Sequence, residues 1–195
     1  MACISKISSA ITYDCDTGGT GLVSALLINK EDIASVAFSS ESPSLVKTIT
    51  LKSGASAYVV DTVKRTLVTT ETLKVNEGAP NAFTHSATVV VTAPVASSLF
   101  NNLINPMANG SFVLLTRTLK AVGSPLSGDT ARVFGLYYGM SATAIERSSH
   151  ENGGWFTITM ATPDRVIGED ALTCEIGMYV TMYEAAVGGG GEVTP

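Results

Sequence analysis

Charged side chains are scarce in this chain. Asp, Glu, Lys and Arg make up 15% of its 195 residues, whereas roughly 25% is typical of soluble domains. The net charge is −5, and the densest basic site is the pair Lys64-Arg65, so the chain lacks the basic stripe with which proteins track nucleic acid. A chain with so few charges has to cover apolar surface, and contacts between identical copies cover it most simply. We therefore expect a homo-oligomer.

Cysteine is scarce as well, and long apolar runs are missing. Cys3, Cys15 and Cys174 form an odd and widely spaced set, which fits neither a secreted disulfide framework nor the C-x2–4-C spacing of a zinc site. Residues 1–10 contain no continuous apolar segment, so we expect no signal peptide. No run approaches the ~18 apolar residues of a membrane span. These absences predict a protein made in the cytoplasm, with reduced thiols, no bound metal and no membrane partner.

Catalytic patterns are also missing. Residues 17–21 are the only glycine-rich loop that resembles a phosphate cradle, but this loop lacks the Lys-Ser/Thr of a P-loop and opens a strand rather than a helix. The two histidines are His85, which alternates with Ala87 and Val89, and His150, which lies in a predicted turn. We expect the first to be packed or to lie in an interface, and the second to be solvated. The sequence therefore predicts no cofactor and no enzyme activity.

Pairs of acidic or aromatic residues are the remaining candidates for a site. The acidic pairs lie in predicted loops, where we expect them to be solvated, although a glycosidase uses two carboxylates at a fixed separation. The aromatic pairs could form a sugar-binding platform, but strand alternation places one member of each pair inside the core. The pairs are Asp14/Asp16, Glu31/Asp32, Glu169/Asp170, Tyr137/Tyr138 and Trp155/Phe156.

The chain is rich in β-strand patterns. Alternating, β-branched segments recur roughly every 8–12 residues, which is typical of a β-sandwich or barrel. We predict a mainly β fold, a β-sandwich or barrel of about nine to eleven strands. The first four strands are expected to form two hairpins, and the strands at 132–146 and 155–162 a third, with Gly135 and Gly139 as bends. The predicted strands are 21–29, 33–38, 45–51, 55–60, 62–75, 84–92, 111–119, 132–146, 155–162 and 172–183.

One segment predicts an α-helix. Pro94 suits the first helical position, apolar residues then recur at helical spacing as far as Met107, and Asn109-Gly110 ends the pattern. We expect this helix, at 94–107, to flank the β-sheets. No change of composition divides the chain before residue 187. We therefore predict an N-terminal arm at 1–20, a single β-rich domain at 21–187 and a flexible tail at 188–195.

The segment 62–75 has the β propensity of a strand but is polar on both faces. Such a strand specifies its own register weakly and adds little to a core. It is therefore either a solvated edge hairpin or an extended arm that pairs with the sheet of another subunit. For the second case the candidate subunit contacts are Leu67, Thr69, Leu73 and Val75, which share one face of the strand.

The order of these segments resembles that of the tail tube proteins (major tail proteins) of long-tailed bacteriophages. The similarity covers most of residues 1–187 as an order of elements. A polar N-terminus leads into the first strand, and an extended hairpin region, a Thr/Val strand, an amphipathic helix and a final hairpin follow. The residues concerned are Cys3, Asp14-Cys15, Gly18-Gly19, the region up to Val75, Asn109-Gly110, residues 112–115, residues 134–136 and Trp155-Phe156.

The resemblance implies a β-sandwich or barrel with a flanking helix. It also implies hexameric rings that stack into a hollow tube in the tail of the virion. The inner strands of the copies would join into one continuous sheet around a lumen, through which DNA passes without specific binding. The segment 62–75 would be the arm between rings, and the partners would be copies of the chain and other tail proteins.

Other functions fit the same pattern. A tail terminator or a capsid decoration protein would share the β content but would not stack into repeated rings. An extracellular carbohydrate-binding or adhesin β-sandwich would show an export signal and an exposed aromatic platform. An enzyme would depend on the acidic pairs alone.

Overall fold

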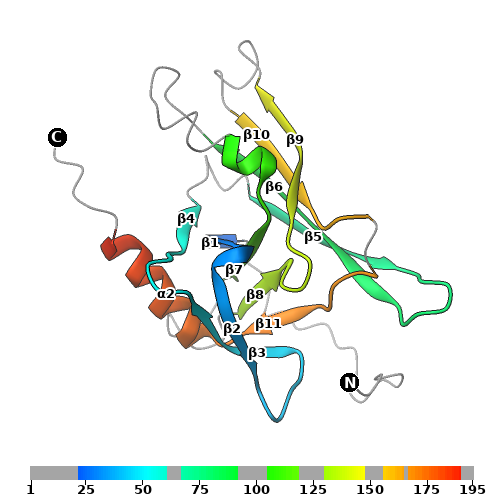
Figure 1. Ribbon diagram of the computed structural model, residues 1–195, viewed down its shortest axis with the longest axis horizontal. Coiled ribbons are helices and arrows are strands. Elements are labelled where there is room, and N and C mark those ends of the chain that lie inside the picture. The colour runs from blue at the N-terminus through cyan, green and yellow to red at the C-terminus, as the bar shows by residue number, and fades with distance from the viewer. Residues whose placement is uncertain are drawn as a thin grey trace, which may run out of the picture.

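The computed structural model of the chain describes residues 22–60, 67–91, 105–118, 130–147, 156–164 and 167–189. Within these residues the chain forms eleven strands and a C-terminal α-helix (Figure 1). The helix α2 (Ile176–Gly189) follows the last strand, and a short 3-10 helix, η2 (Lys30–Asp32), separates the first two. The strands are β1 (Leu22–Asn29), β2 (Ile33–Phe38), β3 (Leu45–Leu51), β4 (Tyr58–Val60), β5 (Val68–Lys74), β6 (Ala82–Val91), β7 (Phe112–Thr118), β8 (Thr130–Phe134), β9 (Ser141–Arg147), β10 (Phe156–Ala161) and β11 (Leu172–Cys174).

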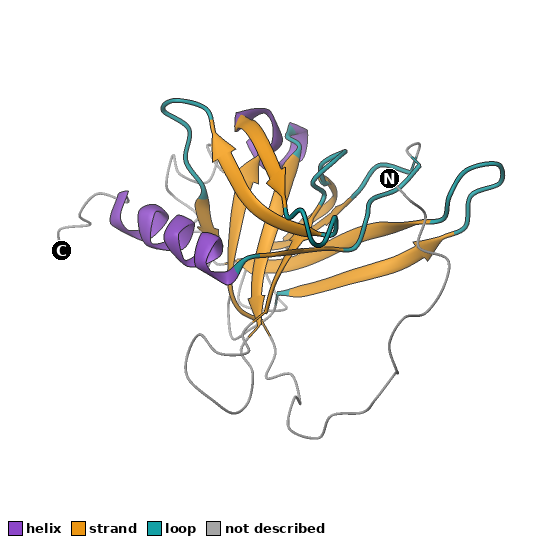
Figure 2. Cartoon of the chain, turned by 90° about the horizontal axis from the view of Figure 1, so that it is seen from below, coloured by secondary structure: helices purple, strands orange, loops and turns teal. Residues whose placement is uncertain are grey.

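The strands form two sheets that pack against each other. The large sheet has seven strands in the order β2-β3-β11-β8-β7-β1-β4, and the small sheet has four in the order β5-β6-β10-β9. One apolar cluster fills the space between the sheets, and a second lies between the large sheet and α2. The prediction of a mainly β fold is confirmed, and the fold is sandwich-like with open edges rather than a closed barrel (Figure 2).

The central strands of the large sheet are apolar on both faces because both faces are covered. In β7, Phe112 and Leu114 belong to the cluster between the sheets, whereas Val113 and Leu115 pack on the side of α2. In β10 of the small sheet, by contrast, buried and partly exposed residues alternate. Strict alternation is expected of a strand that is covered on one face only.

The predicted pairing of the first four strands is wrong, although all four strands exist. β1 pairs with β4 and β7, and β2 pairs with β3. The continuous apolar sequence of β1 suits an inner position that is covered on both faces, while the largely exposed β2 suits an edge. The predicted hairpins of 21–29 with 33–38 and of 45–51 with 55–60 are therefore replaced by the pairing of β2 with β3 and of β1 with the more distant β4 and β7.

The predicted long strand at 132–146 is two strands that belong to different sheets. β8 lies in the large sheet and β9 in the small one. Gly135 and Gly139 have positive φ angles of 72° and 76°, which residues with a Cβ rarely adopt. The predicted bends are confirmed, and between them the chain crosses from one sheet to the other. The predicted hairpin of this segment with the next strand is confirmed for β9 and β10.

The predicted last strand at 172–183 is wrong beyond its first three residues. β11 ends at Cys174, and α2 follows. Tyr179 of α2 is fully buried and donates a hydrogen bond from its hydroxyl to Ser24 Oγ at 2.9 Å. Apolar residues occur on almost every side of this helix, so the sequence lacks the helical periodicity that would have distinguished it from a strand.

The ends of the predicted helix and of the predicted tail are only partly described. Residues 105–109 are helical, whereas the rest of 94–107 lies outside the described residues. α2 extends through Gly189, two residues into the predicted tail, and residues 190–195 and the predicted arm at 1–20 lie outside the described residues. The helix that flanks the large sheet is thus α2, which the sequence did not predict.

Candidate functional site

The predicted subunit contacts lie on and beside the edge strand of the small sheet. β5 pairs with β6 over its whole length in a long hairpin that extends beyond the body of the molecule (Figures 1 and 2). Leu67 is buried in the cluster between the sheets and Thr69 is partly buried, so both face the chain's own interior. Leu73 and Val75, near the tip of the hairpin, are exposed. Val68, at the base of the hairpin, is exposed as well.

The outer half of the hairpin is held by the loop between β10 and β11. Lys74 Nζ donates a hydrogen bond to the Asp164 carbonyl at 2.8 Å, and Asn76 Nδ2 donates one to the Ile167 carbonyl at 2.9 Å. Phe83 and Glu169 exchange two backbone hydrogen bonds of 2.8 and 2.7 Å. These contacts support the hairpin from one side along much of its length.

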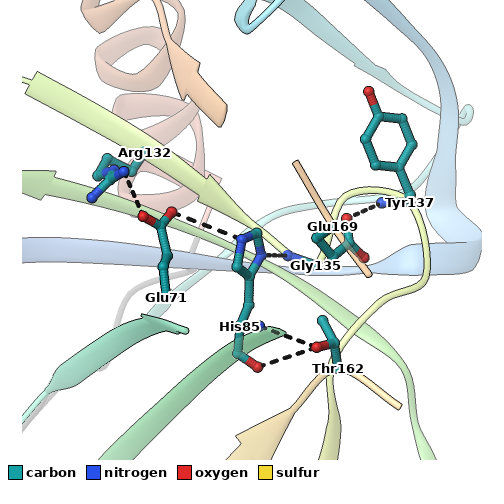
Figure 3. A network of polar contacts seen from close by, with 7 residues as sticks. All are labelled: Glu71, His85, Arg132, Gly135, Tyr137, Thr162 and Glu169. Atoms are coloured by element: carbon teal, nitrogen blue, oxygen red, sulfur yellow. Dashed lines mark hydrogen bonds and ion pairs between the residues drawn. The ribbon is translucent and has the colours of Figure 1, made fainter. Parts of the chain in front are cut away.

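An ion pair between the sheets fixes the inner half of the hairpin. Glu71 Oε2 on β5 lies 2.6 Å from Arg132 Nη2 on β8, and 12% and 42% of the two side chains are exposed (Figure 3). The pair joins the edge strand of the small sheet directly to a central strand of the large sheet.

His85 lies directly opposite Glu71 in the hairpin and is completely buried. Its Nδ1 accepts a hydrogen bond from the Gly135 N–H at 3.0 Å, so the neutral ring carries its proton on Nε2. Nε2 faces Glu71 Oε1 at 3.8 Å, which is too long for a hydrogen bond, and neither atom has another partner among the described residues. The ring also contacts Phe134 edge-on, with centroids 5.3 Å apart.

Burial, and to a lesser extent the charge of Arg132, lowers the pKa of His85 from 6.5 to about 4. The imidazole is therefore neutral at pH 7. Thr162 binds the main chain of His85 rather than its ring: its Oγ1 accepts the His85 N–H at 3.1 Å. With one ring nitrogen bound to a backbone N–H and the other facing a carboxylate, this arrangement is not a nucleophilic triad. The prediction of a packed histidine is confirmed.

Glu169 is the polar residue for which the sequence prediction is wrong. It was expected in a solvated turn, but it is completely buried. Its carboxylate accepts the backbone N–H groups of Tyr137 and Tyr138 at 2.8 and 2.7 Å (Figure 3 draws the first). Burial raises the pKa of Glu169, while these two hydrogen bonds and nearby Lys30 oppose the rise. The carboxylate thus stabilises the turn in which the chain crosses between the sheets.

A local signal for this role does exist in the sequence. Gly168 has a φ of 124°, and an added Cβ would lie 2.7 Å from Ala82 Cβ. A glycine directly before an acidic residue can therefore mark a close approach of two backbones rather than a solvated loop. The partner of that approach, 86 positions earlier in the chain at Ala82, cannot be read from local spacing.

The expectation that one of Tyr137 and Tyr138 is inside the core is wrong, since both side chains are exposed. The turn between Gly135 and Gly139 interrupts the strand alternation on which the expectation was based. For the other aromatic pair, Phe156 is buried as expected, and Trp155 lies outside the described residues.

The remaining candidate residues form no site in the part of the chain that the structure describes. Burial raises the pKa of the Cys174 thiol to about 12, so this cysteine is unreactive at pH 7. No group of three or more potential metal ligands occurs among the described residues. Glu31 and Asp32 lie in η2. Cys3, Cys15, Asp14, Asp16, His150 and residues 17–21 lie outside the described residues.

Comparisons with known proteins place the chain in no family. A scan against protein-family models, a search of curated proteins and a search of solved structures each found no match. Of the helices in the described ranges, none has the length and apolar character needed to cross a membrane.

Proposed function

We propose that the protein is a structural virion subunit, which assembles into rings that stack as the hollow tail tube of a long-tailed bacteriophage. The observation that carries the proposal is the small sheet, in which β5 and β9 are the outer strands and no further strand pairs with them among the described residues. An open strand edge is a template for pairing with another chain. Neither β5 nor β9 contains a proline to block such pairing.

The directions of the strands favour a repeating sheet. All neighbours in the small sheet are antiparallel, so its two outer strands run in opposite directions. If β9 of one copy lies beside β5 of the next, the antiparallel alternation continues across the junction. Because the two edges are different surfaces, such contacts are heterologous and close into a ring when the rotation between copies permits.

The outward face of the small sheet suits a wall past which DNA can slide. In β6 and β10 the residues between the buried ones are mainly hydroxyl-bearing, and those of β5 continue the same face. They are Thr70, Thr72, Thr84, Ser86, Thr88, Thr157 and Thr159, while Glu146 and Lys74 are the charged described residues in the same register. Without a basic cluster this face gives a polyanion little electrostatic attraction.

The hairpin supplies a second contact, which we assign to the neighbouring ring. Leu73 and Val75 expose apolar surface on an element that the molecule otherwise holds firmly through Lys74, Asn76 and Glu71. An apolar surface on a well-supported projection loses little conformational entropy on binding. Contact with a second copy is therefore favoured over a role as a solvated edge.

The test compares two exposed apolar positions. Leu73 on the hairpin and Val187 on α2 are 56% and 55% exposed. We expect the purified wild-type chain to form rings or tubes at high concentration, visible by negative-stain microscopy. Leu73→Asp combined with Val75→Asp should give a folded protein, by circular dichroism, that no longer forms tubes, whereas Val187→Asp should form them normally.

The alternatives give different results in the same experiment. A wild-type chain that stays monomeric at every concentration in light scattering would reject self-assembly and favour a carbohydrate-binding or adhesin domain. Closed single rings that never stack would favour a tail terminator. Normal tubes from the double variant would reject the hairpin as a contact between rings.

A further inference from the structure

Glu71 lies between two cationic or potentially cationic side chains that belong to different parts of the molecule. Arg132 comes from the large sheet, and His85 faces Glu71 across its own hairpin. Glu71 Oε2 is bound by Arg132 at 2.6 Å, whereas Oε1 is 3.8 Å from the imidazole Nε2 and has no hydrogen-bond partner among the described residues. In the neutral state of His85 the carboxylate thus links the hairpin to the large sheet.

Both contacts that connect this cluster to the large sheet come from one short segment. Arg132 lies in β8, and Gly135, whose N–H binds His85 Nδ1, directly follows that strand. The imidazole accepts at Nδ1 only while it is neutral, because protonation places a hydrogen on each ring nitrogen. A protonated His85 would bring two N–H donors face to face at the Gly135 contact of 3.0 Å.

Protonation also changes the competition for Glu71. The charged imidazole would attract Glu71 Oε1 from 3.8 Å away, and that atom has no partner to lose. An attraction between opposite charges is strong at a buried site. Glu71 would then be shared with a partner inside the hairpin, which weakens its link to Arg132 in the large sheet.

We propose that a proton on His85 uncouples the β5–β6 hairpin from the large sheet, by breaking the contact with Gly135 and by drawing Glu71 from Arg132 to His85. The coupling itself is independent of assembly. Its consequence, that acid loosens the element which joins rings, rests on the proposed function.

The groups that face His85 are few and can be named element by element. β5 contributes Glu71, β8 contributes Arg132 and the Phe134 ring, the turn after β8 contributes the Gly135 N–H, and the segment after β10 contributes the neutral Thr162. Because burial and Arg132 lower the pKa of His85 to about 4, the hairpin should be uncoupled only in clearly acidic solution.

The proposal is tested by amide hydrogen exchange on the full-length chain at concentrations below assembly. Exchange of residues 68–74 is compared with that of residues 112–118 in β7 between pH 7 and 3.5, after correction for intrinsic rates. We expect protection of the hairpin to fall about tenfold more than that of β7 as the pH approaches 4, since locally coupled units open independently. Parallel loss in both segments would overturn the proposal.

Variants separate protonation of His85 from the effect of acid on the rest of the protein. In His85→Gln the side chain cannot take up a proton, so the extra acid loss in the hairpin should disappear. His150→Gln, the matched control at the chain's other histidine, should keep the wild-type profile. If His85→Gln retains the acid loss, a group other than His85 causes it and the proposal is rejected.

A second variant covers the case in which His85→Gln does not fold. Arg132→Met removes one of the two contacts with the large sheet, so protection of residues 68–74 should already be lower at pH 7 than in wild type. The remaining acid loss, through the Gly135 contact alone, should be smaller than in wild type. If this variant instead shows wild-type protection at pH 7 and wild-type acid loss, Arg132 does not hold the hairpin and the proposal fails. Neither result depends on whether the protein forms tubes.

Discussion

The two sheets of this protein differ in what covers them. The large sheet has the small sheet on one face and α2 on the other, and its central strands bury apolar residues on both faces. The small sheet has an apolar face towards the core and a hydroxyl-rich face away from it. The difference indicates that the large sheet provides stability for the fold and that the small sheet can present both its edges and one face to other molecules.

A pair of truncations provides the largest test of this comparison. Leu114 in β7 is completely buried, so Leu114→Ala should lower the free energy of unfolding by about 3–5 kcal/mol through lost burial and a residual cavity. Val68→Ala on the exposed edge strand should lower it by less than about 0.5 kcal/mol. Urea unfolding monitored by circular dichroism measures both. Equal losses would mean that the small sheet carries as much of the stability as the large one.

The pH dependence of stability tests His85, whose buried ring lies between Glu71 of the hairpin and the segment that follows β8. The pKa of His85 is lower in the folded protein, about 4, than its unfolded value of 6.5, so the unfolded chain binds more protons in this interval. The contribution of His85 to the free energy of unfolding is complete above pH 6.5. As the pH falls towards 4, the free energy of unfolding decreases by about 3 kcal/mol. Urea unfolding from pH 7 to 4 should show this loss in wild type and lack it in His85→Gln. If the free energy of unfolding of His85→Gln depends on pH as it does in wild type, other groups cause the loss.

Glu169 tests the connection between the sheets. Glu169→Gln keeps one carbonyl acceptor but turns an amide N–H2 towards one of the two tyrosine N–H groups. The lost hydrogen bond and the clash should cost about 1–2 kcal/mol, reduced by the relief of burying a charge. Thermal unfolding would measure it. Glu31→Gln, at an exposed position, is the matched control and should leave the stability unchanged. If Glu169→Gln also leaves the stability unchanged, the turn between the sheets does not need the carboxylate as an acceptor.

The smallest effect is expected on the outward face of the small sheet. Thr157 lies between buried residues of β10 and points away from the core. Thr157→Val should change the free energy of unfolding by less than about 0.5 kcal/mol, and on the proposed function it should leave tube formation intact, because this face lines the lumen rather than a contact. Loss of tubes without loss of stability would place the face in a subunit contact instead.

The sequence predicts the strands of this fold better than their partners. Alternation correctly identifies β6 and β10, because the pattern of a half-buried strand is local. The position of β2 beside β3 rather than β1 depends on which strand needs covering on both faces, and that is a property of the whole sheet. α2 was missed because a helix that is apolar on nearly all sides lacks the helical periodicity.

The candidate site shows the same division. His85 could be expected to be packed from its place between apolar alternating residues, and residues 62–75 could be expected at an edge from their polar faces. The contacts of Glu71 with Arg132 and of Glu169 with the tyrosine turn join residues 61 and 32 positions apart. Nothing in the local spacing of one sequence indicates such pairs.

The position of β11 has a consequence for how the chain is made. This strand of three residues is inserted between β3 and β8 and links the β2–β3 pair to the rest of the large sheet. Thr173 and Glu175 donate backbone hydrogen bonds to the carbonyls of Ser44 and Val46, both at 3.0 Å. During translation β2 and β3 are therefore complete long before the strand that joins them to the sheet. The large sheet is complete only after residue 175 has left the ribosome, so a chain interrupted before this point lacks the finished fold.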